Sequence, residues 1–315
     1  MVVASYGDDV TVWQLVEEVR RRLMGGLGDN INLLAADISE SDTSFELQDE
    51  MHGIGRGTLL EVDIEEMYVR SVNGQQVTVL RGHNRTDPVP HEEDAFARVA
   101  PSYTTRDLFE SVVHEIDALA GLGLYDFETV ETTYDGRSAT VELDVDPSRS
   151  VAFVYKAWRR QSANDRLRPV SVKLMRNVDA PSGYSLQVLS AIEATDLRVT
   201  VAQHFGTPTD ISNSLLSEDG VGIPRHVLPV IAAGAVWRLL LAKESRRLNP
   251  DSSHGSRRAE EVPAGAIGQL VRQARQDYEN VAQRALEAQF AQYPPQATHG
   301  APQGSGAKRS QRIGG

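Results

Sequence analysis

The dipeptide Asn73-Gly74 constrains the fold of this chain more than any other short feature. It separates two strand-like runs within TLLEVDIEEMYVRSVNGQQVTVLRG, residues 58–82. Asn-Gly favours a two-residue turn between antiparallel strands, because both residues tolerate positive φ. At the start of this segment, apolar and acidic residues alternate in LLEVDIEE, which is typical of a strand with one buried face. The segment therefore predicts a small antiparallel β-hairpin unit.

Four other segments have apolar residues at helical spacing. Asp9 is the expected N-cap of the first helix, and Thr104 or Thr105 is that of the second. Pro224 suits the first turn of the third helix. The predicted helices cover residues 11–24, 104–120, 225–247 and 266–290.

Between residues 124 and 206 the apolar residues again recur at every second position, with turns at Asp-Gly and Pro-Ser-Gly. About six short strands at this spacing predict an antiparallel β-sandwich. The chain after residue 294 is rich in proline, glycine and polar side chains, so an extended tail is expected there.

These patterns predict an α+β fold with an antiparallel β-sandwich domain, a small β-hairpin unit, a C-terminal helical region and an extended tail. The composition and the spacing of apolar residues change at a few points along the chain, and we expect the domain boundaries at these points. The expected parts are an N-terminal helix (1–29), a β-hairpin domain (30–100), a helix with the sandwich (101–222), a helical region (223–294) and the tail (295–315).

The 315-residue chain has a formal charge of −12, which is unevenly distributed. Residues 1–100 contain 19 acidic and 8 basic side chains, whereas residues 241–315 contain 7 acidic and 11 basic ones. An acidic N-terminal part and a basic C-terminal part suggest that the chain contacts two different partners, or that neighbouring copies pack head to side. The alternative is that both parts are only solvated surfaces without a partner. The absence of cysteine excludes disulfides, thiolate zinc sites and a cysteine nucleophile.

The start of the chain shows no charged and apolar run typical of a signal peptide. The most apolar segment, residues 227–242, is too short to span a bilayer and is interrupted by Pro229 and Arg238. We expect a buried helix there and no membrane association.

The histidines His83 and His91 are the most conspicuous candidates for chemistry, since three carboxylates follow the second. A metal site needs ligands that converge, and Pro88 and Pro90 between the histidines predict an extended loop instead. A solvated loop is therefore the preferred interpretation, with a metal or acid–base site as the alternative. We predict no catalytic, cofactor-binding or metal-binding residue and no enzymatic activity.

The stretch GRGTLLEVDIEEMYVRSVNGQQVTVLRGHNRTDPVPHEEDA resembles a segment of structural proteins from tailed bacteriophages. The shared pattern is a glycine turn, a strand ending in glutamates, a hairpin, V-x-R-G, and then a threonine and a histidine. Residues 92–95 depart from it, because small residues are usual where this chain has Glu-Glu-Asp-Ala. The matching positions are Gly57, Glu65, Glu66, Val79, Arg81, Gly82, Thr86 and His91.

The downstream order also resembles these proteins: a helix, a β domain, an apolar helix and a long charged helix ending in Tyr-Pro. Over about residues 50–295 the chain is similar to the neck proteins, the head–tail connector or adaptor family. The resemblance implies a homo-oligomeric ring, a dodecamer in this family, located in the virion neck after assembly in the host cytoplasm. Its partners would be the portal protein, the next neck or tail protein, and DNA passing through the channel. A tail-completion or minor tail protein is the alternative within the same class.

The C-terminal tail is the expected partner-binding segment. Phe290 and Tyr293 can anchor its start, and its basic end can meet acidic side chains of a neighbouring subunit. The predicted partner-binding residues are Phe290, Tyr293, Lys308, Arg309 and Arg312.

Overall fold

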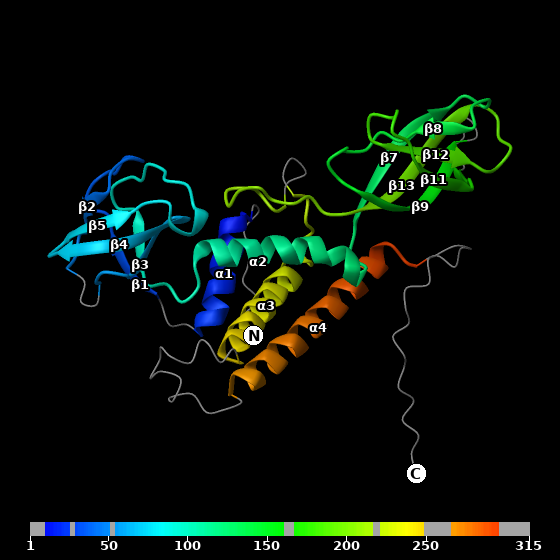
Figure 1. Cartoon of the computed structure of the whole chain (residues 1–315). Coiled ribbons are helices and arrows are strands. Elements are labelled where there is room, and N and C mark those ends of the chain that lie inside the picture. Colours follow the sequence, from blue (N-terminus) through cyan, green and yellow to red (C-terminus); the bar gives the residue numbers. More distant parts are fainter. Residues whose placement is uncertain are drawn as a thin grey trace, which may run out of the picture.

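The computed structural model describes residues 10–25, 29–50, 54–160, 167–216, 221–248 and 266–295; the side chains of 244–248, 266 and 267 are not included. Three units follow one another in space (Figure 1). A β unit lies at one end, a β-sandwich at the other, and the four α-helices of the described residues lie between them. Helix α2 (Thr105–Ala118) runs from the β unit towards the sandwich. The expected α+β class, with a β-sandwich and a C-terminal helical region, is confirmed.

The β unit is a curled six-stranded antiparallel sheet, and it is larger than the hairpin that the sequence suggests. Its strand order is β1-β6-β3-β4-β5-β2. A bridge between Leu34 and Leu47 brings the two edges of the sheet together, and residues such as Leu60 and Met67 fill the interior. The strands are β1 (Asn30–Leu33), β2 (Ser44–Glu46), β3 (Leu59–Val62), β4 (Glu65–Asn73), β5 (Gln76–Leu80) and β6 (Phe96–Val99).

Two tight turns set the register of this sheet. Asn73 pairs with Gln76, so the central residues of the β4–β5 turn are Gly74 and Gln75, one position beyond the expected Asn-Gly. Gly74 has a φ of 63°, which glycine adopts at no steric cost. The β3–β4 turn contains no glycine, and Asp63 occupies the left-handed region there with a φ of 54°. This turn ends the alternating strand earlier than the sequence pattern suggests.

The sandwich consists of a four-stranded sheet, β10-β9-β13-β7, and a three-stranded sheet, β11-β12-β8. The expected number was about six strands, and the described part of the sandwich contains seven. The run RPVSVKLM is split at Val170 and Ser171, so β10 and β11 enter different sheets, as strands do at the corners of sandwiches. The strands are β7 (Asp126–Tyr134), β8 (Thr140–Glu142), β9 (Val151–Arg160), β10 (Leu167–Pro169), β11 (Val172–Arg176), β12 (Tyr184–Val188) and β13 (Thr195–Gln203).

Helices α1 (Val12–Met24), α2, α3 (Leu228–Leu248) and α4 (Ala266–Gln292) share one apolar core, although they come from separate parts of the chain. Thr11, rather than the expected Asp9, caps α1 in a capping box with Gln14. Thr104 caps α2, as one of the two expected residues. Pro224 lies before α3 rather than in its first turn. Among the described residues, no helix is long and apolar enough to cross a membrane.

Candidate functional site

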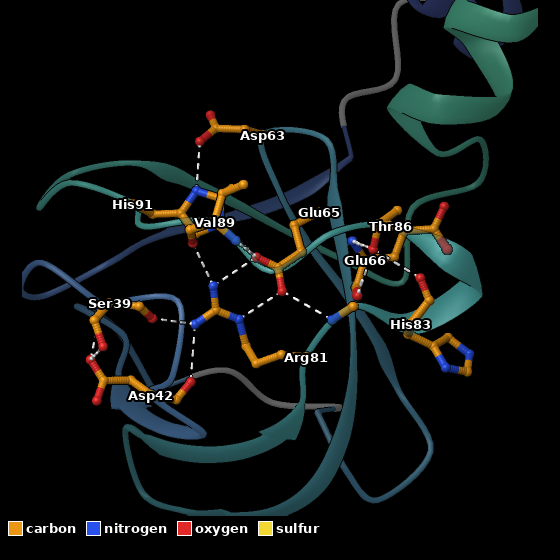
Figure 2. Close-up of polar contacts among 11 residues, drawn as sticks. Ser39, Asp42, Asp63, Glu65, Glu66, Arg81, His83, Thr86, Val89 and His91 are labelled. Carbon is orange, nitrogen blue, oxygen red and sulfur yellow. Dashed lines mark hydrogen bonds and ion pairs between the residues drawn. The ribbon is translucent and has the colours of Figure 1, made fainter.

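The sharp β3–β4 turn places Glu65 at the start of β4 with its side chain inside the β unit. Arg81, immediately after the neighbouring strand β5, meets this carboxylate with two nitrogens: Nε lies 2.6 Å from Oε1 and Nη2 lies 2.7 Å from Oε2. Neither side chain is appreciably exposed. Figure 2 shows this pair at the centre of a polar cluster. A two-point contact of this kind is the strongest geometry that an arginine and a carboxylate can form.

The remaining donors of Arg81 are used by the surrounding backbone. Nη1 donates to the carbonyl oxygens of Ser39 (2.7 Å) and Asp42 (3.0 Å), and Nη2 also donates to that of Val89 (2.6 Å). The N–H groups of Gly82 and Val89 donate in turn to Glu65. The ion pair therefore attaches two loops to the sheet, the loop between β1 and β2 and the loop after β5.

His91 bridges two carboxylates in the same cluster. Its Nδ1 lies 2.8 Å from Asp63 Oδ2, and its Nε2 lies 3.0 Å from Glu65 Oε2. Its backbone pairs with Ile38 in both directions. Burial acts to lower the pKa of His91, but the hydrogen bonds to Asp63 and Glu65 outweigh it, so the pKa is raised.

Glu65 shows the opposite balance. Burial acts to raise its pKa, but hydrogen bonds from Arg81, His91 and two backbone N–H groups lower the pKa to about 2. Glu65 is therefore ionised at any ordinary pH, and a protonated His91 beside it is favoured. Glu65, Arg81 and His91 thus form a cluster of charged side chains in a fixed arrangement.

The other residues of the bacteriophage-like pattern shape the loop after β5. Asn84 Nδ2 donates to Glu66 Oε2 (2.6 Å), and the Thr86 hydroxyl donates to the carbonyl oxygen of His83 (2.9 Å). Thr86 Oγ1 also accepts from the N–H of Glu66 (3.1 Å). Gly82 has a φ of 61°, and a Cβ there would lie 2.8 Å from the carbonyl oxygen of Thr86. This turn thus requires glycine.

The two histidines do not converge. His83 forms a short 3₁₀ turn (His83–Arg85), and its ring lies 5.5 Å from that of Tyr68, whereas His91 belongs to the Glu65 cluster. The loop is held firmly to the sheet, which differs from the solvated loop that we expected. Within the described ranges, no group of three or more His, Asp or Glu side chains is arranged to hold a metal ion.

Chemically, the cluster has little freedom to act. Both ring nitrogens of His91 face carboxylates, and both oxygens of Glu65 accept hydrogen bonds from Arg81 and from backbone N–H groups. A general base must reach a substrate proton within about 3 Å. These groups are instead directed at each other and at the backbone, so the arrangement fits a structural role.

A second buried charged cluster, which the sequence reasoning missed, joins the β unit to the helices. Glu61 of β3 accepts from the N–H and hydroxyl of Thr105, both at 2.6 Å. Arg20 of α1 donates to Thr105 Oγ1 (2.5 Å) and lies 3.6 Å from Glu61. Arg98 of β6 lies 3.6 Å from the same carboxylate. Burial raises the pKa of Glu61, and the hydrogen bonds from Thr105 only partly oppose this.

Of the expected partner-binding residues, the structure describes only two. Tyr293 stacks on Phe127 of β7, with ring centroids 4.1 Å apart, and Phe290 is exposed. Lys308, Arg309 and Arg312 lie outside the described residues. The sequence offers a weak signal for the contact on the sandwich, since Phe127 falls on the same side of its strand as the polar residues Thr129 and Glu131.

No protein-family model matches this chain, and no curated protein matches it either.

Proposed function

We propose that this chain is a structural virion protein of a tailed bacteriophage, a ring-forming head-to-tail adaptor that joins the portal to the tail. One observation carries the proposal. Six of the eight residues of the bacteriophage-like pattern, although separated by up to 26 positions, meet in two adjoining hydrogen-bonded groups around Glu65 and Glu66. These hydrogen bonds hold the surface loop rigid, which suits a structural protein that must form defined contacts with neighbouring subunits.

The arrangement of the units supports the same proposal. The β unit and the sandwich project from opposite ends of the helical unit, so two separate surfaces are available for different neighbours (Figure 1). The β unit is strongly acidic, with 15 acidic and 5 basic side chains between residues 29 and 100. Charge asymmetry favours defined orientations between neighbouring copies. A homo-oligomeric ring that contacts the portal, the next neck or tail protein and DNA in the channel is the assembly we propose.

The protein content of purified particles distinguishes an adaptor from a tail-completion or minor tail protein. We expect the protein in tailless heads that retain the portal, at a fixed ratio to the portal protein by quantitative mass spectrometry. A tail-completion or minor tail protein would instead occur in free tails and be missing from such heads. Absence from both kinds of particle would contradict a virion role altogether.

A metal-dependent enzyme that uses the His83 and His91 loop ranks below these two. Stoichiometric zinc or manganese in the purified protein, lost on His91→Ala substitution, would favour it. The separation of the two histidines argues against a shared metal.

A further inference from the structure

One edge of the sandwich carries an excess of positive charge. Strand β10 lies at the edge of the four-stranded sheet and β11 at the edge of the three-stranded sheet, and the chain passes directly from one to the other at Val170 and Ser171. Residues 151–160 and 167–176, which supply β9, β10 and β11, contain six basic side chains and no acidic one. The five that follow Trp158 form what we call the basic edge: Arg159, Arg160, Arg168, Lys173 and Arg176.

Two arginines of the basic edge lie side by side. Arg168 of β10 is directly opposite Arg159 of β9 in the antiparallel register. The Cβ atoms of such a pair are about 5 Å apart, and like charges at this distance destabilise a sheet. Within the described residues, no carboxylate forms an ion pair with either arginine. The folded chain therefore retains a repulsion that an anionic partner would relieve.

Basic residues at a sheet edge also have a simpler use, because they oppose pairing of the exposed edge with another sheet. That use requires charge on the edge strands themselves, and Arg168, Lys173 and Arg176 supply it on β10 and β11. It does not require Arg159 on the interior strand β9, opposite Arg168. The paired arginines thus point to a surface that binds a partner rich in negative charge.

The opposite end of the molecule carries such charge. In the β unit, the turn before β6 exposes Glu92, Glu93 and Asp94. The N–H of Glu93 donates to Asp37 Oδ1 (2.6 Å), and the N–H of Asp94 donates to the carbonyl oxygen of Leu34 (3.0 Å), so the turn is fixed to the segment after β1. No basic side chain of the described residues forms an ion pair with these carboxylates. We call this group the acidic face: Asp37, Glu92, Glu93 and Asp94.

We propose that the basic edge binds the acidic face of a second copy of this chain. The two surfaces belong to opposite ends of the molecule, with the helices between them, so one copy cannot bring its own two surfaces together (Figure 1). Charge complementarity then joins the sandwich of one copy to the β unit of the next. A head-to-tail contact of this kind repeats, and it closes into a ring or continues as a filament. It is the subunit contact of the proposed homo-oligomeric ring and rests on that proposal.

Self-association of the free protein should depend steeply on ionic strength, because exposed ion pairs are individually weak and are screened by salt. Sedimentation velocity over a series of protein concentrations measures this. At low ionic strength we expect an average mass above the 34.5 kDa of one chain, and a return to that value at high ionic strength. A monomer at every concentration at low ionic strength would overturn the contact, whereas the composition of particles decides the virion role separately.

Charge reversal tests each surface in turn. Arg168→Glu with Lys173→Glu reverses two exposed residues of the basic edge, and Glu92→Lys with Glu93→Lys reverses two exposed residues of the acidic face. The first change also places a carboxylate opposite Arg159, which supports the pairing of β9 with β10. Each of the two variants alone should remain monomeric at low ionic strength.

Two further variants separate the contact from other effects. Arg272→Glu with Arg284→Glu makes the same change in net charge as the basic-edge reversal, at exposed positions of α4, and should associate as the unaltered protein does. Arg168→Gln with Lys173→Gln only removes charge and should also weaken self-association. It provides the reading if the reversal at the basic edge disturbs the fold.

A second reversal should restore what the first removes. An equal mixture of the basic-edge and acidic-face variants should associate, because each contact again joins opposite charges, and so should one chain that carries all four reversals. Restored association in either supports the contact. The proposal is wrong if neither associates, if the α4 control loses association, or if the acidic-face variant alone associates as the unaltered protein does.

Discussion

Arg81 and Glu65 form a two-point ion pair inside the β unit, with nitrogen–oxygen distances of 2.6 and 2.7 Å and almost no exposure of either side chain. The pair holds the loop between β1 and β2 and the loop after β5 against the sheet. Each partner makes the burial of the other acceptable, so the loss of one is more damaging than the loss of both.

Replacing Arg81 with methionine should destabilise the β unit by about 3–5 kcal/mol, because Glu65 would remain buried without its partner. Hydrogen exchange of the β4 and β5 amides measures this locally. Arg70→Met, at an exposed position on β4, is the matched control and should change the opening free energy by less than about 0.5 kcal/mol. A similar small effect of Arg81→Met would contradict a structural role for the pair.

His91 should make the stability of the β unit depend on pH in one direction. Its folded-state pKa is raised above the ordinary value of 6.5, so protonation favours the folded form. The contribution is complete below about pH 6.5 and is lost as the pH rises through the folded-state pKa. The stability difference between the unaltered protein and His91→Gln should therefore be largest near pH 6 and shrink towards pH 9.

The same titration with His114→Gln serves as the comparison, because this histidine is exposed on α2. Thermal unfolding across this pH range provides the data. If the stability difference between the unaltered protein and His91→Gln grew as the pH rose, protonation of His91 would not stabilise the folded form and the prediction would be wrong.

Gly234→Ala should destabilise the helical unit, although alanine normally favours a helix over glycine by about 1 kcal/mol. A Cβ at this position of α3 would overlap the carboxyl group of Glu115, which is bonded to the Tyr278 hydroxyl and to Arg238 Nε. Overpacking of this kind costs about 1–3 kcal/mol. Gly121→Ala has open space around the added methyl group and should be neutral, and chemical unfolding compares the two.

Deleting residues 296–315 should leave the melting temperature of the free protein nearly unchanged, because the composition of this segment offers little apolar surface to bury. The same deletion should impair stable joining of heads and tails if the basic chain end docks on a neighbouring subunit. Complementation of a strain that lacks the protein, scored by electron microscopy of particles, measures this. Full assembly with the truncated chain would show that the tail is only solvated and that its docking is not needed for assembly.

Local patterns located the helices well. The four expected segments correspond to α1, α2, α3 and α4 with ends that differ by a few residues, and a hairpin turn does lie beside Asn73. These features depend on side chains within one or two turns of each other, so periodicity and turn residues are sufficient to predict them.

The candidate site could be predicted only in part. The pattern around Glu65, Arg81 and His91 was visible as a set of residues, but not as a cluster with His91 between two carboxylates. The turn at Asp63 and Ile64 lacks glycine, and its position follows from the pairing of β3 with β4 rather than from a local signal. The early turn redirects Glu65 to the interior, where Arg81 can reach it.

The sequence by itself determined the helices, the β-rich segments and the turn beside Asn73, because neighbouring residues carry that information. Only the tertiary structure decided that α1 and α2 share a core with α3 and α4, and that Glu61 and Glu65 are buried. The physical reason is distance along the chain. A carboxylate can be buried only where partners remove the cost of its desolvation, and Thr105 and Arg81 lie 44 and 16 residues away from the glutamates that they satisfy.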